Sequence, residues 1–507
     1  MKLDDLFNEL GNNAILNSTE TEIIGITCDS RKVRPGFLFA ALKGYMSDGR
    51  KFIQDAIKRG ASAILSDVMI IMPEDVALVL SSRPRKLYAQ ICAKFMGDPS
   101  KNLRLIGVTG TNGKTTITYL IKDIFDNAGL DCGMIGTVDN YLGNSEKVTA
   151  SMTTPDPENL QYFLRRMSDN GLFSGVLEVS SHALAMNRTT GIKFDAGIFT
   201  NLTQDHLDFH HNFSDYAQIK ATFFKQIKSD GVAVINGDDE YCGIMMKSCQ
   251  SKIVTFGIKF PHTFHARDIE LSARGTTFDL VYPGGVHRIH SPLLGNFNVY
   301  NILAAFATAI NMGISASEIE ETVAKTKGAP GRLQKITPFT APISVIVDYA
   351  HTPDALENVL STLRKVSSGK ICTVFGAGGN RDKSKRPLMG AIAEKLSDKV
   401  FVTSDNPRAE DPNDIIADIE NGMTGKNKHE IIPDREQAIA AAIKQAQYND
   451  IVLIAGKGHE DYQILGKKTI HFDDREIAKF YYEHYHSGKS VKSVPKIGII
   501  RKKKTTA

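Results

Sequence analysis

A glycine-rich loop between an apolar strand and a helix constrains this chain more than any other feature of its sequence. The stretch NLRLIGVTGTNGKTTITYLIKDIFDNAG predicts a strand that ends at Val108 and a helix that opens at Lys114. Backbone N–H groups of such a loop wrap a phosphate, and the helix N-terminus adds positive potential. Lys114 supplies a cation, and Thr115 supplies a hydroxyl for Mg²⁺. The predicted phosphate-binding residues are Gly110, Thr111, Asn112, Gly113, Lys114, Thr115 and Thr116.

This loop is a short form of the P-loop, because Val108 stands where the general motif has its first glycine. The alternative is a glycine-rich turn with an incidental lysine. Strand, loop, Lys-Thr-Thr and helix occur in the expected order, which favours the phosphate site. A P-loop alone does not separate a motor, a kinase, a ligase and a GTPase.

The rest of the chain alternates short apolar strands with helices. In its last part, strands are predicted at ISVIVDY, KICTVF, KVFVT and DIVLIAG. Such alternation predicts α/β domains with parallel sheets, which bind ligands at the carboxyl ends of their strands. The 507 residues suffice for about three domains. We place them at residues 1–100, 101–332 and 333–485, with the second boundary just after the hinge sequence KGAPGR.

Composition limits the class of protein. No apolar run approaches the roughly 18 residues that a membrane span needs. The N-terminal MKLDDLFNEL is acidic and amphipathic, unlike a signal peptide. Six scattered cysteines without a CxxC pair are typical of reduced thiols in a cytoplasmic protein. We therefore expect a cytoplasmic protein without a membrane span, and a monomer.

The C-terminal tail, residues 486–507, holds seven Lys and Arg and no acid, whereas the whole chain has a net charge of +4. The body is therefore mildly acidic. The tail is predicted to be a solvated, disordered end, and contact with nucleic acid or anionic lipid is the alternative.

The stretch TSDNPRAEDP follows the predicted strand DKVFV and places Arg408 directly after an Asn-Pro turn. An arginine at the carboxyl end of a strand either caps loop carbonyls or awaits an anion. Arg408 is expected at the edge of a parallel sheet where ligands bind, so its position alone does not decide between these two roles.

Short motifs occur in order along the chain: DSRKVRPGFLFAALKG, GTNGKTT, TTP, EVSSHAL, TNLTQDHLDFH, YAQIKATFF, GNFNVYN, GAPGR, DYAHTPDAL, GNRDKSKRPLMG, DNPRAEDP and AGKGHEDYQ. With them the chain resembles the Mur ligases over nearly its whole length, and leaves out only the basic tail. The resemblance implies an ATP-dependent ligase that adds meso-2,6-diaminopimelate to UDP-N-acetylmuramoyl-L-alanyl-D-glutamate through an acyl phosphate. It also implies an N-terminal α/β domain for the UDP-substrate, a central P-loop domain for ATP and a C-terminal Rossmann-like domain for the amino acid.

The resemblance implies a catalytic set of Lys114, Glu178, His206 and Lys220. Glu178, His206 and Thr115 would ligate Mg²⁺, although either Glu178 or His206 alone would more often be a satisfied polar group at a strand end. Lys220 matches the family lysine that becomes carbamylated. A free ammonium would be repelled by Mg²⁺, whereas a carbamate is an oxygen ligand. The alternative for Lys220 is an exposed helix lysine.

The same resemblance assigns the substrate sites. ATP would be bound by the P-loop residues together with Asn298, Asn301, Arg332 and Asp348. The UDP-substrate would be bound by Ser30, Thr153, Thr154, Ser180, Met186, Arg188 and His351. Diaminopimelate would be bound by Arg381, Asp405, Asn406, Pro407, Arg408, Gly456 and Glu460. Arg408 would grip the distal carboxylate bidentately, and Glu460 would pair with the distal ammonium.

Four residues depart from the family pattern: Arg50 replaces His, Met152 replaces Asn, Met186 replaces Gln and Gln334 replaces Glu. The first three would alter contacts to the UDP-substrate, and none touches the phosphate or metal set.

Three alternatives remain at this point. A ligase for L-lysine or another diamino acid is disfavoured by Arg408, because L-lysine has no distal carboxylate. An inactive Mur-like binding protein is disfavoured because the catalytic set is complete. A nucleic-acid-binding P-loop ATPase is suggested by the tail alone.

Overall fold

The computed structural model describes residues 1–7, 10, 14–17, 20–44, 48–203, 213–272, 275–338, 340–425 and 428–486. The chain forms two compact units. The first is Met1–His265 with Tyr300–Ile319, and the second is Ala266–Val299 with Glu320–Ala507. Among the described helices, none is both long and apolar enough to cross a bilayer.

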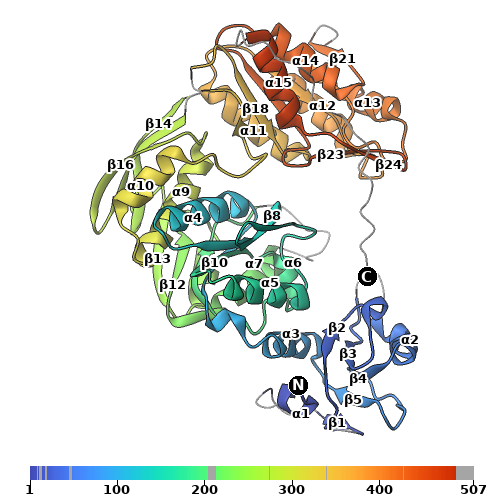
Figure 1. Cartoon of the computed structure of the whole chain (residues 1–507). Helices are drawn as coiled ribbons and strands as arrows, with labels where there is room; N and C mark the ends of the chain where they lie inside the picture. The colour runs from blue at the N-terminus through green and yellow to red at the C-terminus, as the bar shows by residue number, and fades with distance from the viewer. Residues whose placement is uncertain are drawn as a thin grey trace. The chain divides into compact units, whose positions relative to one another are not determined.

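An N-terminal sheet opens the first unit (Figure 1), with strand order β1-β5-β4-β3-β2. Strand β1 is antiparallel to β5, and the other pairs are parallel. Side chains alternate between its two faces: Leu38 packs with α1 and α3, whereas Phe39 packs with α2. The elements are α1 (Leu3–Phe7), β1 (Ala14–Leu16), β2 (Gly25–Thr27), β3 (Phe37–Ala40), α2 (Ile53–Lys58), β4 (Ala61–Ser66), β5 (Ala77–Leu80) and α3 (Pro84–Phe95).

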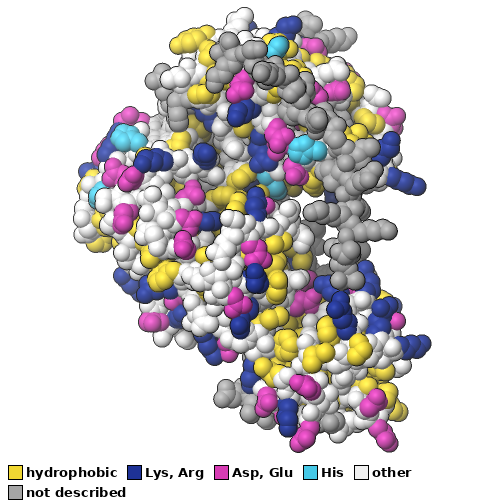
Figure 2. Space-filling model, viewed as in Figure 1, with side chains coloured by type: hydrophobic (Ala, Val, Ile, Leu, Met, Phe, Trp, Pro, Cys, Tyr) yellow, Lys and Arg dark blue, Asp and Glu magenta, His cyan; other side chains and the backbone are white. Residues whose placement is uncertain are grey.

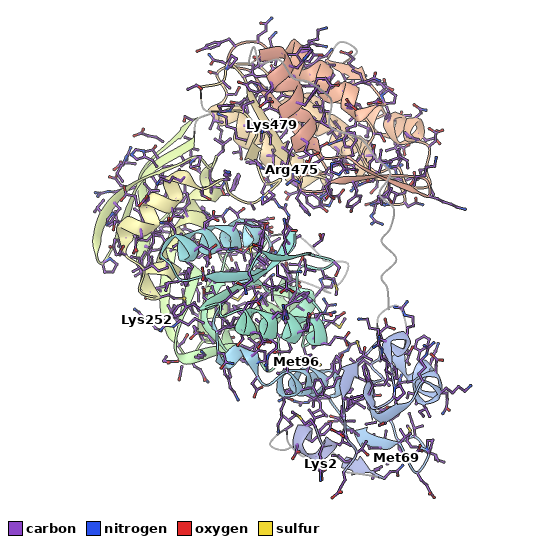
Figure 3. All side chains as sticks on the ribbon, viewed as in Figure 1. Lys2, Met69, Met96, Lys252, Arg475 and Lys479 are labelled. Atoms are coloured by element: carbon purple, nitrogen blue, oxygen red, sulfur yellow. The ribbon has the colours of Figure 1, made fainter. Side chains whose placement is uncertain are left out.

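A second sheet of the first unit follows α3. Met96, labelled in Figure 3, lies where α3 ends, and its carbonyl accepts a hydrogen bond from Arg165 of α5 at 3.4 Å. The strand order is β13-β12-β11-β6-β10-β7-β8-β9, parallel from β13 to β7. The elements are β6 (Arg104–Thr109), α4 (Lys114–Asn127), β7 (Cys132–Ile135), β8 (Asp139–Gly143), β9 (Glu146–Thr149), α5 (Pro157–Asp169), β10 (Ser174–Glu178), α6 (Ser181–Ala185), β11 (Phe194–Phe199), α7 (Phe213–Ala221), β12 (Ile227–Asn236), α8 (Cys242–Lys247) and β13 (Lys252–Gly257).

Four elements lie in the chain where the units divide: β14 (Phe264–Ser272), the hairpin β15 (Gly275–Tyr282) and β16 (Gly285–Ser291), and α9 (Asn296–Asn311), which α10 (Ala316–Lys325) follows. The hairpin turns at Pro283 and Gly284. Helix α9 contains Asn298 and Asn301, which the resemblance assigns to the nucleotide site.

The last sheet, in the second unit, has strand order β17-β18-β22-β19-β20-β21 and is parallel except at β17. Helices cover both of its faces. Ile346 packs with α11, α12 and α13, whereas Val345 and Val347 pack with α14 and α15. The parallel sheet predicted for this part of the chain is confirmed. The elements are β17 (Gln334–Lys335), β18 (Ser344–Asp348), α11 (Pro353–Val366), β19 (Ile371–Phe375), α12 (Lys385–Leu396), β20 (Lys399–Val402), α13 (Pro412–Glu420), β21 (His429–Ile431), α14 (Arg435–Gln445), β22 (Ile451–Ala455), β23 (Tyr462–Leu465), β24 (Lys468–His471) and α15 (Asp474–His486).

The predicted basic tail lies outside the described residues from 487 onward, and His486 is the last residue of α15. The fold class is as predicted, because each of the three expected parts contains an α/β sheet. The predicted domain boundaries stay predictions.

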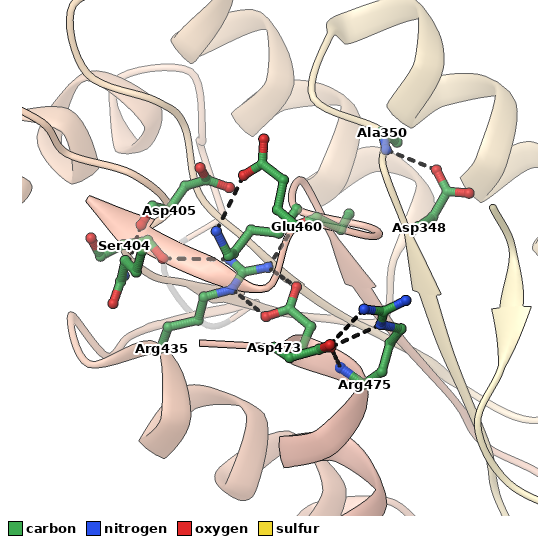
Figure 4. Close-up of polar contacts among 12 residues, drawn as sticks. Asp348, Ala350, Ser404, Asp405, Arg435, Glu460, Asp473 and Arg475 are labelled. Atoms are coloured by element: carbon green, nitrogen blue, oxygen red, sulfur yellow. Dashed lines mark hydrogen bonds and ion pairs between the residues drawn. The ribbon is translucent and has the colours of Figure 1, made fainter. Parts of the chain in front are cut away.

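A buried ion pair joins α14 to α15 beneath the last sheet's carboxyl edge (Figure 4). The side chains of Arg435 and Asp474 have no exposed surface, and their closest nitrogen and oxygen lie 2.7 Å apart. Arg435 also donates to the carbonyl of Ala455 at 3.0 Å and to that of Ser404 at 3.4 Å. One guanidinium therefore connects the ends of β20 and β22.

We expect Arg435→Met to lower the free energy of unfolding by about 3–5 kcal/mol, because it leaves Asp474 buried without its cation. Adding Asp474→Leu should recover most of that loss, since a matched apolar pair replaces the ions. Urea unfolding of the full chain, followed by circular dichroism, measures both. The exposed pair of Arg364 and Asp398, each 40% accessible, is the control. Arg364→Met should cost about 0–1 kcal/mol, and equal losses for the two arginine variants would contradict the prediction.

Candidate functional site

The glycine loop follows β6, and backbone geometry explains its glycines. Gly110 and Gly113 have φ values of +144° and +89°, which L side chains rarely adopt. A Cβ on Gly110 would lie 1.9 Å from the hydroxyl of Thr200, and one on Gly113 would lie 2.5 Å from Oδ1 of Asn301. Both positions therefore exclude a side chain, and the loop can curl tightly enough to enclose a phosphate.

Residues after β11 hold this loop in place. Thr200 donates its hydroxyl to the carbonyl of Asn112 at 2.6 Å, and Asn201 accepts the N–H of Asn112 at 3.0 Å. The N–H of Thr111 donates to the carbonyl of Asn201 at 2.8 Å. Sequence reasoning did not single out Thr200 or Asn201, although they stand in the TNLTQDHLDFH motif.

Two lysines meet at one carbonyl of the loop. Lys114, the first residue of α4, donates to the carbonyls of Gly110 at 3.1 Å and Thr111 at 2.8 Å. Lys220 of α7 donates to the same carbonyl of Gly110 at 2.8 Å. Lys220 is 1% exposed, and its Nζ lies 4.6 Å from the ring centroid of Tyr216. The alternative of an exposed helix lysine is therefore wrong, and the shared carbonyl brings two ammonium groups close together.

A buried carboxylate lies next to the loop. Glu178, at the end of β10, is 1% exposed and accepts the hydroxyl of Thr115 at 3.0 Å. Thr137 donates to it from its N–H at 2.8 Å and from its hydroxyl at 2.9 Å. The hydroxyl and carboxylate oxygens of Thr115 and Glu178 are the donors that Mg²⁺ prefers. His206 lies outside the described residues, within which no group of three His, Cys, Asp or Glu side chains could hold a metal.

A cavity of about 280 Å³ opens between the N-terminal sheet and the start of α5. Two predicted UDP-substrate residues, Met186 and Arg188, line it with Cys28 and Arg85. Arg188 donates to the carbonyl of Thr154 at 2.8 Å and pairs with Asp156 at 3.1 Å, so its guanidinium is held in place. The cavity is rimmed by both cationic and apolar groups.

The other predicted UDP-substrate residues have these positions. The hydroxyl of Thr154 donates to the carbonyl of Glu178 at 2.7 Å and accepts the N–H of Ser180 at 3.1 Å. Thr153 accepts from the hydroxyl of Thr137 at 3.2 Å. Ser30 is buried at the start of a short 3₁₀ turn. His351 belongs to the second unit, where its Nδ1 lies 2.9 Å from the carbonyl of Tyr349.

One carboxylate fixes the loop that carries Ser30. Glu158, in the first turn of α5, accepts the N–H of Cys28 at 3.3 Å, the phenol of Tyr88 at 2.7 Å and the ammonium of Lys32 at 3.1 Å. Burial, with the nearby Glu158 charge, raises the pKa of the Cys28 thiol to about 12. Cys28 is therefore protonated near neutral pH and serves as a wall, not as a nucleophile.

Three departures from the family pattern make contacts within the chain. Arg50 pairs with Asp48 at 2.6 Å and with Asp67 at 3.5 Å. Met152 lies with its sulfur 3.4 Å from the guanidinium of Arg188, beside the cavity. Gln334 accepts the N–H of Gly331 at 2.8 Å and so braces the GAPGR hinge.

The predicted nucleotide residues beyond the loop lie on α9 and near β18. Oδ1 of Asn301 lies over Gly113, 2.5 Å from where a Cβ would stand on that glycine. Asn298 donates to the carbonyl of Leu294 at 2.9 Å. In the second unit, the guanidinium of Arg332 lies 5.0 Å from the ring centroid of Tyr349. Asp348 accepts the N–H groups of Leu333 at 2.6 Å and Ala350 at 2.8 Å. Burial raises the pKa of Asp348, and the charge of Arg332 opposes the rise.

Two arginines of the second unit flank a glycine. A Cβ on Gly378 would lie 2.9 Å from Nη1 of Arg408 and 3.8 Å from Cγ of Arg381. Arg408 donates to the carbonyls of Gly379 at 2.9 Å and Asn406 at 3.4 Å. In the described part of the chain, no carboxylate lies within 4.0 Å of either guanidinium, whereas Arg386, Arg435 and Arg475 are all ion-paired. Arg408 therefore caps loop carbonyls, and no carboxylate of the described residues neutralises its charge.

The backbone of Arg408 supports a functional reading. Its φ is +54°, a left-handed conformation that is costly for a residue other than glycine. Backbone bonds to Ile464 at 3.1 Å and to Gly466 at 2.7 Å hold it there against β23.

Two carboxylates of the predicted site, Asp405 and Glu460, lie on the loops after β20 and β22 (Figure 4). Asp405 is 8% exposed, and Oδ2 of Asp405 would lie 2.7 Å from a Cβ on Gly456, whose φ is +115°. Asn406 donates its amide to Glu460 at 2.8 Å and accepts the N–H of Ile464 at 2.9 Å. The predicted diaminopimelate residues thus come from the loops that follow β19, β20 and β22.

A further arginine, which sequence reasoning missed, braces these loops. Arg386 has no exposed side-chain surface and pairs with Glu410 at 3.0 Å and Asp418 at 2.8 Å. It also donates to the carbonyl of Gly378 at 3.3 Å. Its hydrogen bonds, with that from the N–H of Asn380, lower the pKa of Glu410 to about 2. The Gly378 loop and the loop after Arg408 are therefore tied to one buried cation.

Three sequence families match the chain in order. The description "Mur ligase family, catalytic domain" matches residues 22–96, "Mur ligase middle domain" matches residues 108–309, and "Mur ligase, glutamate ligase domain" matches residues 331–458.

Curated relatives match over nearly their full length. A UDP-N-acetylmuramoyl-L-alanyl-D-glutamate–2,6-diaminopimelate ligase of Clostridium tetani is 42% identical over 94% of this chain and 99% of its own. The proteins of the same name from Alkaliphilus metalliredigens and Clostridioides difficile are each 44% identical over 94% of this chain, and over 98% and 99% of their own chains.

Solved structures also match this chain over most of its length. A structure with that same enzyme name has a TM-score of 0.71 at 35% identity and covers 96% of this chain and 99% of its own. The MurF ligase of Thermotoga maritima, solved with ADP, has a TM-score of 0.58 at 19% identity, over 86% of this chain and 94% of its own. The second likeness concerns the fold alone.

We expect Gly113→Ala to weaken ATP binding by about tenfold to a hundredfold, because the new methyl group displaces Asn301 from the loop. Gly129→Ala is the matched control, since Gly129 also has positive φ, +73°, but opens onto free space. Both variants should lose about 1 kcal/mol of stability from backbone strain. Titration with a fluorescent ATP analogue, alongside urea unfolding, separates the effects. Unchanged affinity in Gly113→Ala would remove the loop from the nucleotide site.

Proposed function

The chain belongs to the Mur ligase family, and from that premise we propose that it joins meso-2,6-diaminopimelate to UDP-N-acetylmuramoyl-L-alanyl-D-glutamate with the consumption of ATP. The curated relatives that bear this activity in their names match nearly the whole chain. Because both ATP and a UDP-linked sugar are substrates, the reaction belongs in the cytoplasm.

The observation that carries the choice of amino acid is the Arg381 and Arg408 pair around Gly378. Two guanidinium groups without a carboxylate partner in the described residues suit a carboxylate ligand, which arginine binds in a planar fork. The carboxylate of Glu460 stands on a neighbouring loop and suits an ammonium. A substrate with an amino group and a carboxylate at its far end fits both.

The phosphate loop supports the activation step. A carboxylate is a poor acyl donor, so ATP converts it to an acyl phosphate, which the amine then attacks and from which phosphate leaves. Lys114 is placed to neutralise charge at the transferring phosphoryl group. Thr115 and Glu178 would hold Mg²⁺, which supplies charge neutralisation on the phosphates when bound.

Lys220 is proposed to act as a carbamate. As an ammonium it would share the Gly110 carbonyl with Lys114, so that a buried cation and a half-buried cation repel one another. Carbamylation, in which the deprotonated amine adds to CO₂ and a further proton is lost, replaces one of those charges with an anion that Lys114 and the metal both attract. The carbamate would then orient the nucleotide loop from its buried side.

Three other functions fit less well. A ligase for L-lysine would leave Arg408 and Arg381 facing no carboxylate. An inactive binding protein would have no use for the buried pairing of Glu178 with Thr115. A nucleic-acid-binding ATPase would require a cationic face, but on the side drawn in Figure 2 the Lys and Arg side chains are interspersed with Asp and Glu.

The direct test is ATP consumption by the purified protein with UDP-N-acetylmuramoyl-L-alanyl-D-glutamate and either meso-diaminopimelate or L-lysine. Release of phosphate that depends on the UDP-substrate and diaminopimelate supports the proposal. Turnover with L-lysine at an equal or higher kcat/KM would reassign the amino acid, and no turnover with any amino acid would remove the ligase activity.

Arg408→Ala should raise the KM for diaminopimelate by roughly 30-fold to several-thousand-fold, because the distal carboxylate loses its partner. Alanine keeps the left-handed backbone strain, so the comparison isolates the guanidinium. The KM values for ATP and the UDP-substrate should change far less, and steady-state kinetics with each substrate varied in turn measure all three. An equal rise in all three would mean that Arg408 only caps its own loop.

Lys220→Ala should lower kcat by about a hundredfold or more, since it removes the proposed carbamate and with it an oxygen ligand of the metal. Added formate or acetate should restore part of the rate by filling the vacated space. Lys225→Ala, on the same chain segment but exposed, is the control and should stay fully active. A fully active Lys220→Ala variant would sink the carbamate.

A further inference from the structure

A fully buried lysine lies behind the predicted amino-acid site. Lys457, in the loop after β22, has no exposed surface. Its Nζ lies 3.3 Å from Oε2 of Glu460 and also donates to the carbonyl of Tyr462. The same Nζ lies 5.4 Å from the centroid of the Tyr462 ring. Glu460 is the accessible member of the pair, with 17% of its side chain exposed.

Burying an ammonium is costly unless a carboxylate compensates its charge. Glu460 provides that carboxylate for Lys457. Asn406 donates to the same Oε2 at 2.8 Å, which fixes the carboxylate from two directions. In this ion pair, Lys457 is buried and Glu460 reaches solvent. The apolar strand IVLIA that precedes it gives no local reason for a charge at this depth.

Other charged groups surround this pair. Asp405 stands on the loop after β20, and Arg435 enters from α14 beneath both carboxylates, as Figure 4 shows. Tyr349 lies after β18, and Tyr462 opens β23. Of these groups in the described residues, Lys457 makes an ion pair with Glu460.

We propose that Lys457 is a positioning residue for amino-acid recognition, which holds and orients the Glu460 carboxylate so that it receives the distal ammonium of the substrate. This inference rests on the proposed function. Lys457 itself does not touch the substrate, because it has no exposed surface. It acts through Glu460, and its effect should therefore be confined to the part of the substrate that Glu460 recognises.

The test compares two substrates that differ only in the distal amino group. meso-Diaminopimelate carries it, and 2-aminopimelate lacks it while keeping the distal carboxylate. The measured quantity is the ratio of their kcat/KM values in wild type, Lys457→Gln, Lys457→Met, Glu460→Gln and the double variant Lys457→Gln/Glu460→Gln. Gln keeps a donor for the Tyr462 carbonyl, which guards against misfolding, and thermal melting checks each variant. Lys468→Met, an exposed lysine on β24, is the matched control.

We expect the preference for diaminopimelate to fall by at least roughly tenfold in Lys457→Gln and Lys457→Met, and to fall in Glu460→Gln as well. In the double variant, Lys457→Gln should add nothing to the loss caused by Glu460→Gln, because the two residues act as one unit. The KM for ATP and the preference in Lys468→Met should stay unchanged.

Three outcomes would overturn the inference. An equal loss for both amino acids would make Lys457 a purely structural residue. A stronger preference for diaminopimelate would mean that Lys457 repels the ammonium. Additive losses in the double variant would mean that Lys457 acts by a route other than Glu460. If wild type turns over neither substrate, the proposed function itself fails, and that result differs from all three.

Discussion

Parallel strands end at a common edge, and the chemistry of this chain depends on that constraint. In the first unit, β6, β10 and β11 deliver the glycine loop, Glu178 and Thr200 to one place, although nearly a hundred residues separate the first from the last. In the second unit, β18, β19, β20 and β22 do the same for Asp348, Gly378, Asp405 and Gly456. Loops on such an edge have no partner strands, so their shape must come from side chains and from glycine conformations.

Buried cations supply that shape in the second unit. Arg386 ties the Gly378 loop to the segment after Arg408, Arg435 ties the ends of β20 and β22, and Lys457 holds Glu460. Each is compensated by a carboxylate, as a charge without access to water must be. Arg381 and Arg408, for which no ion pair is found in the described residues, are proposed to meet the substrate.

Local patterns explain how much of this could be predicted from the sequence. Apolar runs of four to six residues predicted the strands, and Gly, Lys and Thr in a fixed order predicted the phosphate loop, because these signals lie within one short segment. Lys457 stands inside the AGKGHEDYQ motif, but its burial and its bonds to Glu460 and to the carbonyl of Tyr462 exist only in the folded chain. The pairing of Arg435 with Asp474 spans 39 residues, and that of Glu158 with Cys28 spans 130. The sequence does not decide whether Arg408 caps carbonyls or awaits an anion. The answer depends on which carbonyls and carboxylates surround the guanidinium in the folded chain.

The left-handed backbone of Arg408 has a consequence for how such a site can change. Glycine or asparagine would adopt that conformation more readily, so either would relax the loop by about 1 kcal/mol. Selection for stability alone would therefore favour losing the guanidinium, whereas selection for the proposed recognition of the substrate carboxylate would oppose that loss. The arginine is thus a record of a compromise between the two pressures, and thermostable variants of this chain that retain it must recover the strain elsewhere.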